Sequence, residues 1–312
     1  MSRLPVLALA VGFFIAAALA SNDAGAFCRM TTKDKVQVGN STCSGEGIPL
    51  EWRDACLQYS IDARGSMWMS LGDVESAVSA SFETWQNQTC SGGELTNVIF
   101  TMGANSTCRQ IEFNERGPNL NTVAFLDPWV RDGDLSDPLP PNAFALTNVF
   151  FRENTGQILD ADMLINETLG PYDSCPDSGC PPGSPGPADL QSIVTHEAGH
   201  FIGIGHSDVA EATMFASAPR TEVTKRTLAA DDIDAICTIY PPGNLNASCD
   251  STPIGGLDLN CEDSEPPPTS ASGSGGCSAA PRGQRLPWET TVIAVLALMA
   301  LRRRSFRRDA RY

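Results

Sequence analysis

Histidine, basic residues and long hydrophobic runs are scarce in this chain of 312 residues, which has only three histidines. The 21 Lys and Arg residues are outnumbered by 37 Asp and Glu residues, so the formal net charge is −16 at pH 7. A chain this acidic cannot neutralise the phosphates of a nucleic-acid backbone, and we exclude a nucleic-acid partner. The hydrophobic runs at residues 4–20 and 290–301 are shorter than the roughly twenty residues that a membrane span needs.

All three histidines lie in one stretch, residues 195–207, which reads T-H-E-A-G-H-F-I-G-I-G-H-S. His196 and His200 are four residues apart, so on an α-helix they share one face and could bind one metal ion together. Gly203 tolerates a positive φ, which lets the chain leave the helix and bring His206 back to the same ion. Three neutral imidazoles suit Zn²⁺ and leave its fourth position for water.

Glu197 directly follows the first predicted zinc ligand. A carboxylate at this place can take a proton from the water as it attacks a carbonyl group. The alternative is an amphipathic helix with exposed histidines, but a chance match to the longer pattern is on the order of one in a million for a chain of this length. We therefore interpret Glu197 as a general base beside a hydrolytic zinc site.

The pattern H-E-x-x-H-x-x-G-x-x-H resembles the signature of the metzincin zinc proteases, and Ser207 after the third histidine is similar to the matrixin branch. Met214 lies at the offset from His206 that matrixins use for the methionine of a tight turn beneath the metal; core filling is its alternative role. The resemblance covers residues 52–240. It implies an α+β fold in which a twisted mixed sheet carries packed helices and a small C-terminal subdomain follows the third zinc histidine.

The function that this resemblance implies is a zinc-dependent endopeptidase acting on protein or peptide substrates. A non-catalytic metal-binding adhesion protein on the same scaffold is one alternative, although the intact Glu197 argues against it. A non-proteolytic zinc hydrolase is another, and Ser207 and Met214 make it less consistent with the sequence. Neither a pro-domain cysteine nor the histidines of a second structural zinc site are recognisable. We expect one zinc ion per chain, and any latency to arise in another way.

The remaining apolar patterns predict the elements around the motif. Residues 71–86 have apolar positions at helical spacing, with Asp73 as the candidate N-cap. A second helix should begin at Ala188 or Asp189 and carry the histidines. We predict strands at residues 56–61, 95–102, 121–126, 145–152 and 158–166, and a closing helix at residues 228–240.

The resemblance also implies where a substrate would lie. Residues 145–150 correspond to the sheet edge along which a peptide adds as a strand, with an ordinary edge strand as the alternative. Residues 215–221 correspond to the wall of the pocket for the side chain after the scissile bond. Residues 171–187 are rich in Pro, Gly and Ser and should form a surface loop stapled by a disulfide. No individual substrate-binding residue can be assigned.

Eleven cysteines in an exported chain imply disulfides, and the odd number leaves one cysteine with another role. Cys277 is the natural exception because it lies in a separate tail. The other ten would form five bridges. Closeness in sequence suggests that Cys175 pairs with Cys180 and that Cys249 pairs with Cys261, while the remaining pairs stay open.

The ends of the chain predict export to the extracellular space or the outer cell surface. Residues 1–26 have the charge, apolar run and small residues of a secretory signal peptide, with a second cleavage site after Ala20 and a membrane anchor as the alternative. A protease domain at residues 27–243 and a Pro/Ser/Gly-rich linker at residues 244–276 would follow. Residues 277–312 resemble a MYXO-CTERM sorting tail, through which alone we expect membrane contact; the alternative is a permanent anchor.

Calcium is a second candidate ion. Oxygen ligands could come from a predicted acidic loop, for which a solvated surface is the alternative, at Asp127, Asp132, Asp134 and Asp137. The preferred peptide bonds and the oligomeric state do not follow from the sequence.

Overall fold

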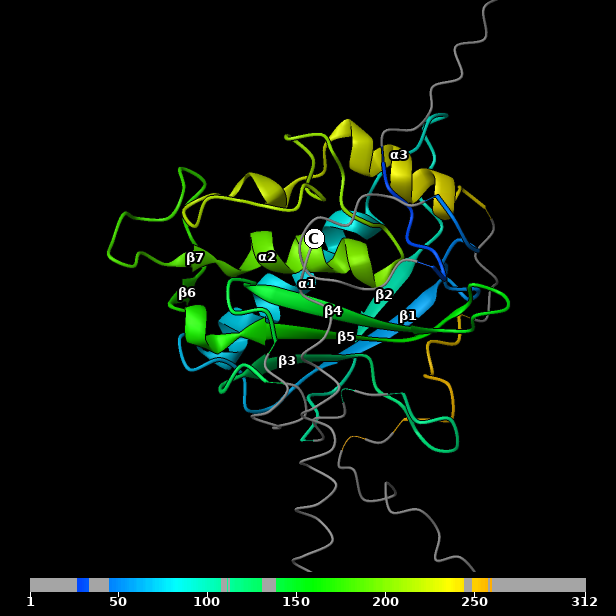
Figure 1. Ribbon diagram of the computed structural model, residues 1–312, viewed down its shortest axis with the longest axis horizontal. Helices are drawn as coiled ribbons and strands as arrows, with labels where there is room; N and C mark the ends of the chain where they lie inside the picture. Colours follow the sequence, from blue (N-terminus) through cyan, green and yellow to red (C-terminus); the bar gives the residue numbers. More distant parts are fainter. Residues whose placement is uncertain are drawn as a thin grey trace, which may run out of the picture. The chain divides into compact units, whose positions relative to one another are not determined.

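A five-stranded mixed sheet forms the centre of the protein (Figure 1). The computed structural model describes residues 27–33, 45–107, 111, 113–130, 139–243, 249–257 and 259. The strand order is β2-β1-β3-β5-β4, and only β4 runs antiparallel to its neighbour. The strands are β1 (Cys56–Ile61), β2 (Ile99–Met102), β3 (Thr122–Leu126), β4 (Ala145–Phe151) and β5 (Ile158–Asn166). The predicted α+β class is confirmed, and β4 is the edge strand as predicted.

One predicted strand is four residues shorter than expected, whereas two others are shorter by one residue each. Residues 95–98 do not join β2; instead, the Asn97 N–H and the Thr96 hydroxyl donate to the carbonyl oxygen of Tyr240, over 3.0 Å and 2.8 Å. These bonds satisfy the polar groups away from the sheet, so the strand begins only at Ile99.

Two helices pack against one another and cover one face of the sheet (Figure 1). Helix α1 (Leu71–Gln86) buries Val74, Val78, Phe82 and Trp85, the residues that helical spacing selects. Its N-cap is Ser70 and not Asp73: the Asp73 N–H donates to Ser70 Oγ over 3.2 Å. The prediction chose the wrong member of the pair because both side chains are good caps, and only the backbone shows where the first turn begins.

Helix α2 (Leu190–Phe201) is held against α1 by polar contacts as well as apolar packing. Trp85 Nε1 donates to the carbonyl oxygen of Thr195 over 2.8 Å, and Ser81 Oγ donates to that of Gln191 over 3.0 Å. Because both acceptors lie within α2, these bonds set how far the helix can slide or rotate over α1.

The chain after α2 forms a smaller subdomain. It contains a 3₁₀ turn, η3 (Thr224–Arg226), and helix α3 (Ala230–Ile239), which matches the predicted closing helix. Before α2, a 3₁₀ turn and a small parallel pair of strands complete the described elements: η2 (Glu167–Leu169), β6 (Tyr172–Asp173) and β7 (Ala188–Asp189).

The disulfides confirm one predicted pair and correct another. Cys175 and Cys180 are bonded as predicted. Cys249, however, is bonded to Cys56 at the start of β1, not to Cys261. The described residues after Cys249 pass the chain before β3, where Gly256 O accepts a 3.0 Å bond from the Asn119 N–H. Closeness in sequence was therefore misleading. Cys90 is bonded to Cys237, and the total of five bridges stays a prediction.

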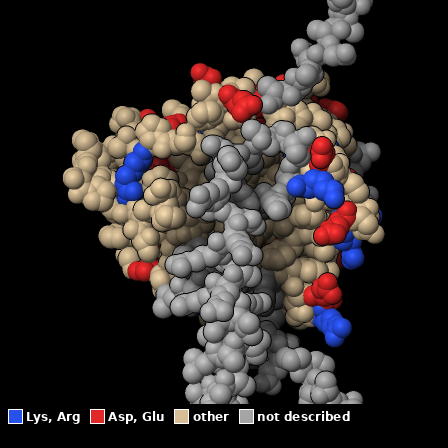
Figure 2. Space-filling view, viewed as in Figure 1, with Lys and Arg blue, Asp and Glu red and all other residues tan. Residues whose placement is uncertain are grey.

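Several predictions lie outside the described residues: the signal peptide, most of the linker, the sorting tail and three of the four candidate calcium ligands. Within the described part of the chain, helices are too short or too polar to cross a bilayer. On the described residues visible in Figure 2, acidic and basic side chains lie scattered among uncharged ones.

Candidate metal centre and cleft

Helix α2 carries the candidate site, and side chains form hydrogen bonds with the backbone at both of its ends. Asp189 is the N-cap, accepting a 2.8 Å bond from the Ser192 N–H. At the other end, Trp52 Nε1 donates to Phe201 O over 2.8 Å, and the Tyr240 hydroxyl donates to Ile202 O over 3.0 Å. These side chains satisfy carbonyls that a helix end leaves without partners, and so they hold the helix in place.

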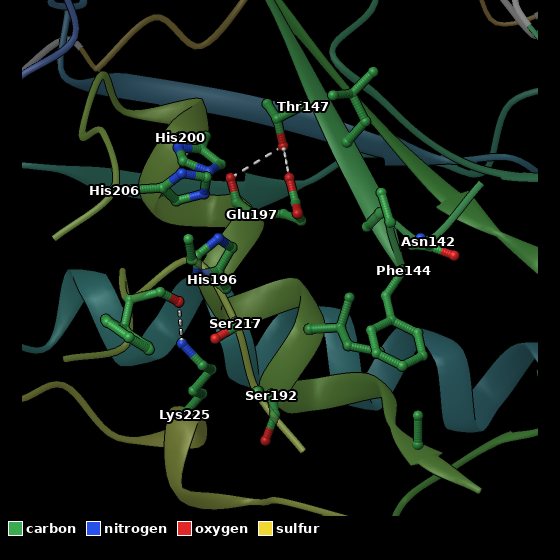
Figure 3. A pocket seen from close by; sticks show the side chains of 18 of the residues that line it. Asn142, Phe144, Thr147, Ser192, His196, Glu197, His200, His206, Ser217 and Lys225 are labelled. Atoms are coloured by element: carbon green, nitrogen blue, oxygen red, sulfur yellow. Dashed lines mark hydrogen bonds between the residues drawn. The ribbon is translucent and has the colours of Figure 1, made fainter. Parts of the chain in front are cut away.

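The three histidine side chains converge at the C-terminal end of α2 (Figure 3). Their ligand atoms lie within 4.8 Å of one another, and the Nε2 atoms of His200 and His206 are 3.2 Å apart. Gly203 has a φ of 90°, and a Cβ there would lie 2.8 Å from Leu50 O. Glycine is therefore needed at this turn, which returns the chain so that His206 faces the two helical histidines.

The other ring nitrogens of two histidines are held by backbone carbonyls. His196 Nδ1 lies 2.7 Å from Thr213 O, and His200 Nδ1 lies 2.8 Å from Ile204 O. Donation from Nδ1 leaves Nε2 as the free acceptor, which is the tautomer that binds a metal ion. Burial lowers the pKa of all three rings, that of His200 to about 3, so the imidazoles stay neutral near pH 7.

Glu197 lies beside the histidines and is bonded to the sheet. Its Oε2 accepts a 2.7 Å bond from the hydroxyl of Thr147 on β4 (Figure 3). Burial raises the pKa of Glu197 to about 7, and the bond from Thr147 opposes that rise. A bound cation would lower the pKa further, so the carboxylate could accept a proton near neutral pH and give it back.

A turn around Met214 packs against α2. The Met214 side chain packs so closely on the helix that a Cβ at Gly199 would lie 2.2 Å from its Sδ. The backbone of this turn is bonded on both sides. Asp232 accepts from the N–H groups of Thr213 and Met214 over 2.7 Å and 3.0 Å. The buried Lys225 ammonium donates to Thr213 O over 2.8 Å, the same oxygen that His196 meets.

A cavity of about 490 Å³ opens beside the histidines. Residues 145–147 of the predicted edge line one side together with residues 142–144, which precede β4, and residues 215–220 of the predicted wall line the other. Residues 148–150 of the predicted edge do not line the cavity. Ser192 and Ile193 of α2 lie between them. Cys28 and Met30, close to the start of the predicted protease domain, also line the cavity.

The residues present fit a zinc ion. Three neutral imidazoles at one point form a ligand set typical of catalytic zinc, which keeps one position open. The described residues contain one other cluster of possible ligands, Cys175, Cys180 and Asp189. Its cysteines are joined in a disulfide, which removes the thiolates that zinc would need.

Comparison with known proteins agrees with this geometry. The family model described as Matrixin, of the peptidase M10 type, matches residues 51–241. The chain belongs to the matrixin family. Zinc binding is implied by that membership, and the three histidines are the group that could provide it. The matched region covers the sheet, the three α-helices of the described residues and the cavity lining except Cys28 and Met30.

Proteins similar to this chain include plant and fungal proteins. Metalloendoproteinase 1-MMP of Arabidopsis thaliana is 36% identical over 124 residues, which is 39% of this chain and 31% of that protein. Metalloendoproteinase 1 of Glycine max is 46% identical over 52 residues, 17% of each chain. Extracellular metalloprotease 1 of Coccidioides posadasii is 27% identical over 219 residues, 65% of this chain and 71% of that protein. The chain thus spans a third or less of the two plant relatives.

Thr147 and Lys225 belong to this matrixin's site although the sequence alone did not indicate them. Both are buried, and each contacts the site through a hydrogen bond to a residue outside its own helix or strand. A buried lysine in a polar loop looks like a solvated charge in sequence, so no local signal could have selected it.

Proposed function

We propose that this matrixin is an exported zinc endopeptidase. The observation that carries the proposal is the meeting of three neutral histidines and the Glu197 carboxyl at one end of a cavity lined by an edge strand. His196, His200 and His206 would hold the zinc ion. When bound, Zn²⁺ would act as a Lewis acid on the scissile carbonyl and make water easier to deprotonate.

The side chains of this protein would supply the proton transfers and the alignment. Glu197 would accept the proton of the attacking water and then donate it to the leaving amine. Thr147 would hold one carboxylate oxygen, Oε2, and leave Oε1 for the water. A substrate would pair with the β4 edge as an added strand, and the side chain after the scissile bond would enter the cavity against the wall.

Export is supported by the predicted signal peptide, by the disulfides and by the printed name of the Coccidioides relative, an extracellular metalloprotease. We propose that the tail from residue 277 sorts the protein to the surface and is removed or modified near Cys277. Mass spectrometry of the surface protein would contradict this by recovering an unmodified peptide that ends in Tyr312.

The deciding experiment compares the purified protein with Glu197→Ala and, as a matched control, with Glu153→Ala at an exposed position in the β4–β5 turn. Casein cleavage should fall by about 10³-fold or more in Glu197→Ala, since a general base contributes on this scale. Zinc content should stay unchanged, and Glu153→Ala should be fully active. Full activity of Glu197→Ala would overturn the mechanism. An inactive wild type that binds zinc would favour the adhesion protein.

A further inference from the structure

The loop stapled by Cys175–Cys180 lies directly against the wall of the cavity. We name residues 171–187 the stapled segment. From here on, the wall means residues 215–227, which include the predicted wall at residues 215–221. The Cys180 N–H donates to Thr221 O over 3.0 Å. Arg220 Nη2 donates to Pro171 O over 3.2 Å, and its Nε donates to Gly186 O. The middle of the wall is thus bonded to three places on the stapled segment.

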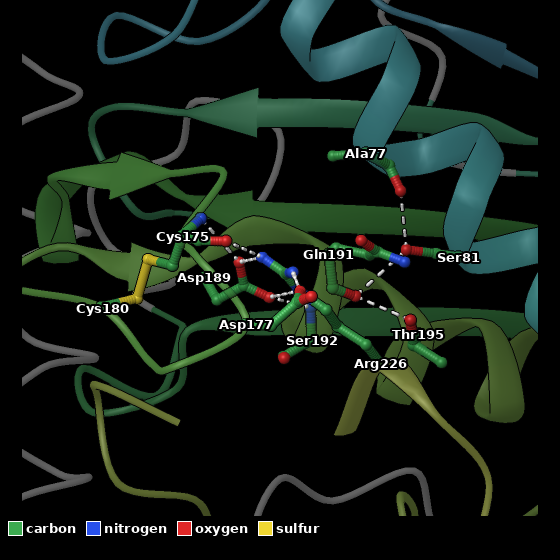
Figure 4. A network of polar contacts seen from close by, with 10 residues as sticks. All are labelled: Ala77, Ser81, Cys175, Asp177, Cys180, Asp189, Gln191, Ser192, Thr195 and Arg226. Atoms are coloured by element: carbon green, nitrogen blue, oxygen red, sulfur yellow. Dashed lines mark hydrogen bonds and ion pairs between the residues drawn. A yellow bond between two sulfur atoms is a disulfide. The ribbon is translucent and has the colours of Figure 1, made fainter. Parts of the chain in front are cut away.

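Arg226, at the end of the wall, makes the most extensive contact (Figure 4). Its Nε donates to Asp189 Oδ2 over 2.8 Å, and its Nη2 donates to Asp189 Oδ1, so the guanidinium grips both carboxylate oxygens. Nη2 also donates to Cys175 O over 2.6 Å. Forked bonds between a guanidinium and a carboxylate are among the strongest polar contacts in proteins, and they fix an angle as well as a distance.

Asp189 joins these contacts to the metal-bearing helix. It caps α2, and it also accepts a 3.1 Å bond from the Cys175 N–H. Burial alone would raise the pKa of Asp189, but the bonds from Arg226 and from the N–H groups lower it, so the carboxylate is charged at neutral pH. One side chain therefore connects the start of α2, the stapled segment and the wall.

These contacts lie where the start of α2 lines the proposed substrate pocket. Asp189, Ser192 and Ile193 line the cavity from the side of α2, whereas Phe215 and Arg220 line it from the wall. The width of the cavity is the distance between these two sides. Arg226 and the stapled segment connect them, so they set that distance without touching the histidines.

We propose, building on the endopeptidase function above, that the stapled segment is a specificity-determining element and that Arg226 is its positioning residue. Together they hold the wall at a fixed distance from α2, so that the cavity accepts side chains of a defined size. If the wall moves away from α2, a large substrate side chain in the cavity loses apolar contact, whereas a small one loses little. The proton transfers at Glu197 stay intact because that side chain is held separately by Thr147.

The first test uses Arg226→Met, which keeps the apolar stem and removes the fork. Two peptides are compared that differ only in the residue entering the cavity, leucine or alanine. The ratio of their kcat/KM values should fall by about tenfold, the scale at which pocket contacts discriminate apolar side chains. The change should appear as a higher KM for the leucine peptide with kcat nearly unchanged. Arg226→Lys keeps the charge but not the forked pair of bonds. Its ratio of kcat/KM values should lie between those of wild type and Arg226→Met.

The second test removes the staple with Cys175→Ser and Cys180→Ser together, and it should lower the same ratio. Matched controls are Arg116→Met, an exposed arginine that does not line the cavity, and Cys90→Ser with Cys237→Ser, which removes a disulfide outside it. Both controls should keep the wild-type ratio. An unchanged ratio in the Arg226 and staple variants, or an equal loss for both peptides, would overturn the proposal. If Arg226→Met does not bind zinc, Arg226→Lys and the staple variant decide.

Hydrogen exchange separates this proposal from the proposed function. Amides of residues 215–223 should exchange at least about tenfold faster in Arg226→Met and in the staple variant than in wild type, because the bonds of Arg226 to Asp189 and Cys175, or the disulfide of the stapled segment, no longer hold the wall in place. This measurement needs no substrate. A wild type that cleaves neither peptide would refute the endopeptidase function, whereas unchanged exchange of the wall in both variants would refute the role of the stapled segment.

Discussion

Two regions of this protein bury a charged side chain, but only one of them surrounds it with hydrogen-bond partners. In the turn beneath the histidines, the Lys225 ammonium donates to the carbonyl oxygens of Ala212, Thr213 and Phe215. On the helix-free face of the sheet, Asp160 is also buried, at 1% exposure against 7% for Lys225. Among the described residues, neither of its carboxylate oxygens accepts a hydrogen bond from an N–H group or a hydroxyl, and the carboxyl of Asp162 lies beside it.

The difference shows what each buried charge does for the fold. A charge that is bonded to several backbone groups fixes their positions, and its removal leaves those groups without partners. Burial lowers the pKa of Lys225, but the carboxylates of Glu222 and Asp232 oppose that effect and favour the charged form. Burial raises the pKa of Asp160 to about 7, because its carboxylate has little to compensate for lost water. We expect the first region to need its charge and the second to be more stable without one.

The largest expected effect concerns the metal itself. Replacing His200 with Ala should remove essentially all tightly bound zinc, because the only histidines of the chain are those of the site. Metal analysis by mass spectrometry on EDTA-rinsed protein should give one zinc ion per wild-type chain and none per variant chain. Two zinc ions per wild-type chain would show that cysteines or acidic loops form a second site.

Lys225→Met should destabilise the fold by about 3 kcal/mol, since it leaves three buried carbonyls without their donor. Activity should fall as well, because Thr213 O, which holds His196, lies in the same turn. Urea unfolding and kcat/KM measure the two effects. The exposed Lys33→Met should change stability by less than about 0.5 kcal/mol. An equally small effect of Lys225→Met would remove the contrast between the two regions.

Asp160→Asn should have the opposite sign and should depend on pH. The raised pKa means that the folded state holds a proton that the unfolded state has released, between the ordinary pKa of an aspartic acid and about 7. Wild-type stability should therefore fall as the pH rises through that window. At pH 8 the variant should be more stable than wild type by about 2 kcal/mol, and at pH 4 the two should nearly agree.

Urea unfolding at both pH values tests this prediction, with Asp54→Asn at an exposed position as the control. A variant that is less stable than wild type at pH 8 would contradict it. That result would mean that a positively charged partner compensates the Asp160 carboxylate in the folded protein.

The smallest expected effect is on the orientation of Glu197. Thr147→Val keeps the shape of the side chain and removes its hydroxyl, and kcat should fall by about tenfold, the value of one good hydrogen bond. KM should hardly change. Thr147→Ser keeps the hydroxyl and should restore most of the rate. Equal losses in both variants would indicate a packing defect instead of a lost bond.

The strands and helices could be predicted where burial follows a simple period. Helix α1 and strand β5 match their predicted ranges because apolar residues repeat at helical spacing along α1 and make up most of β5. The prediction was wrong at Cys249 because a disulfide joins residues that the fold brings together, here across 193 positions. No spacing rule reports such a distance.

The sequence by itself determined the group of candidate zinc ligands. His196 and His200 are one helical turn apart and Gly203 permits the return to His206, so local backbone geometry is enough to bring the three rings together. Only the tertiary structure decided what surrounds them: Thr147 on Glu197, Lys225 under the turn and Arg226 on Asp189. These bonds cross between separate elements, and the burial that makes them strong exists only after the sheet, the helices and the wall have packed together.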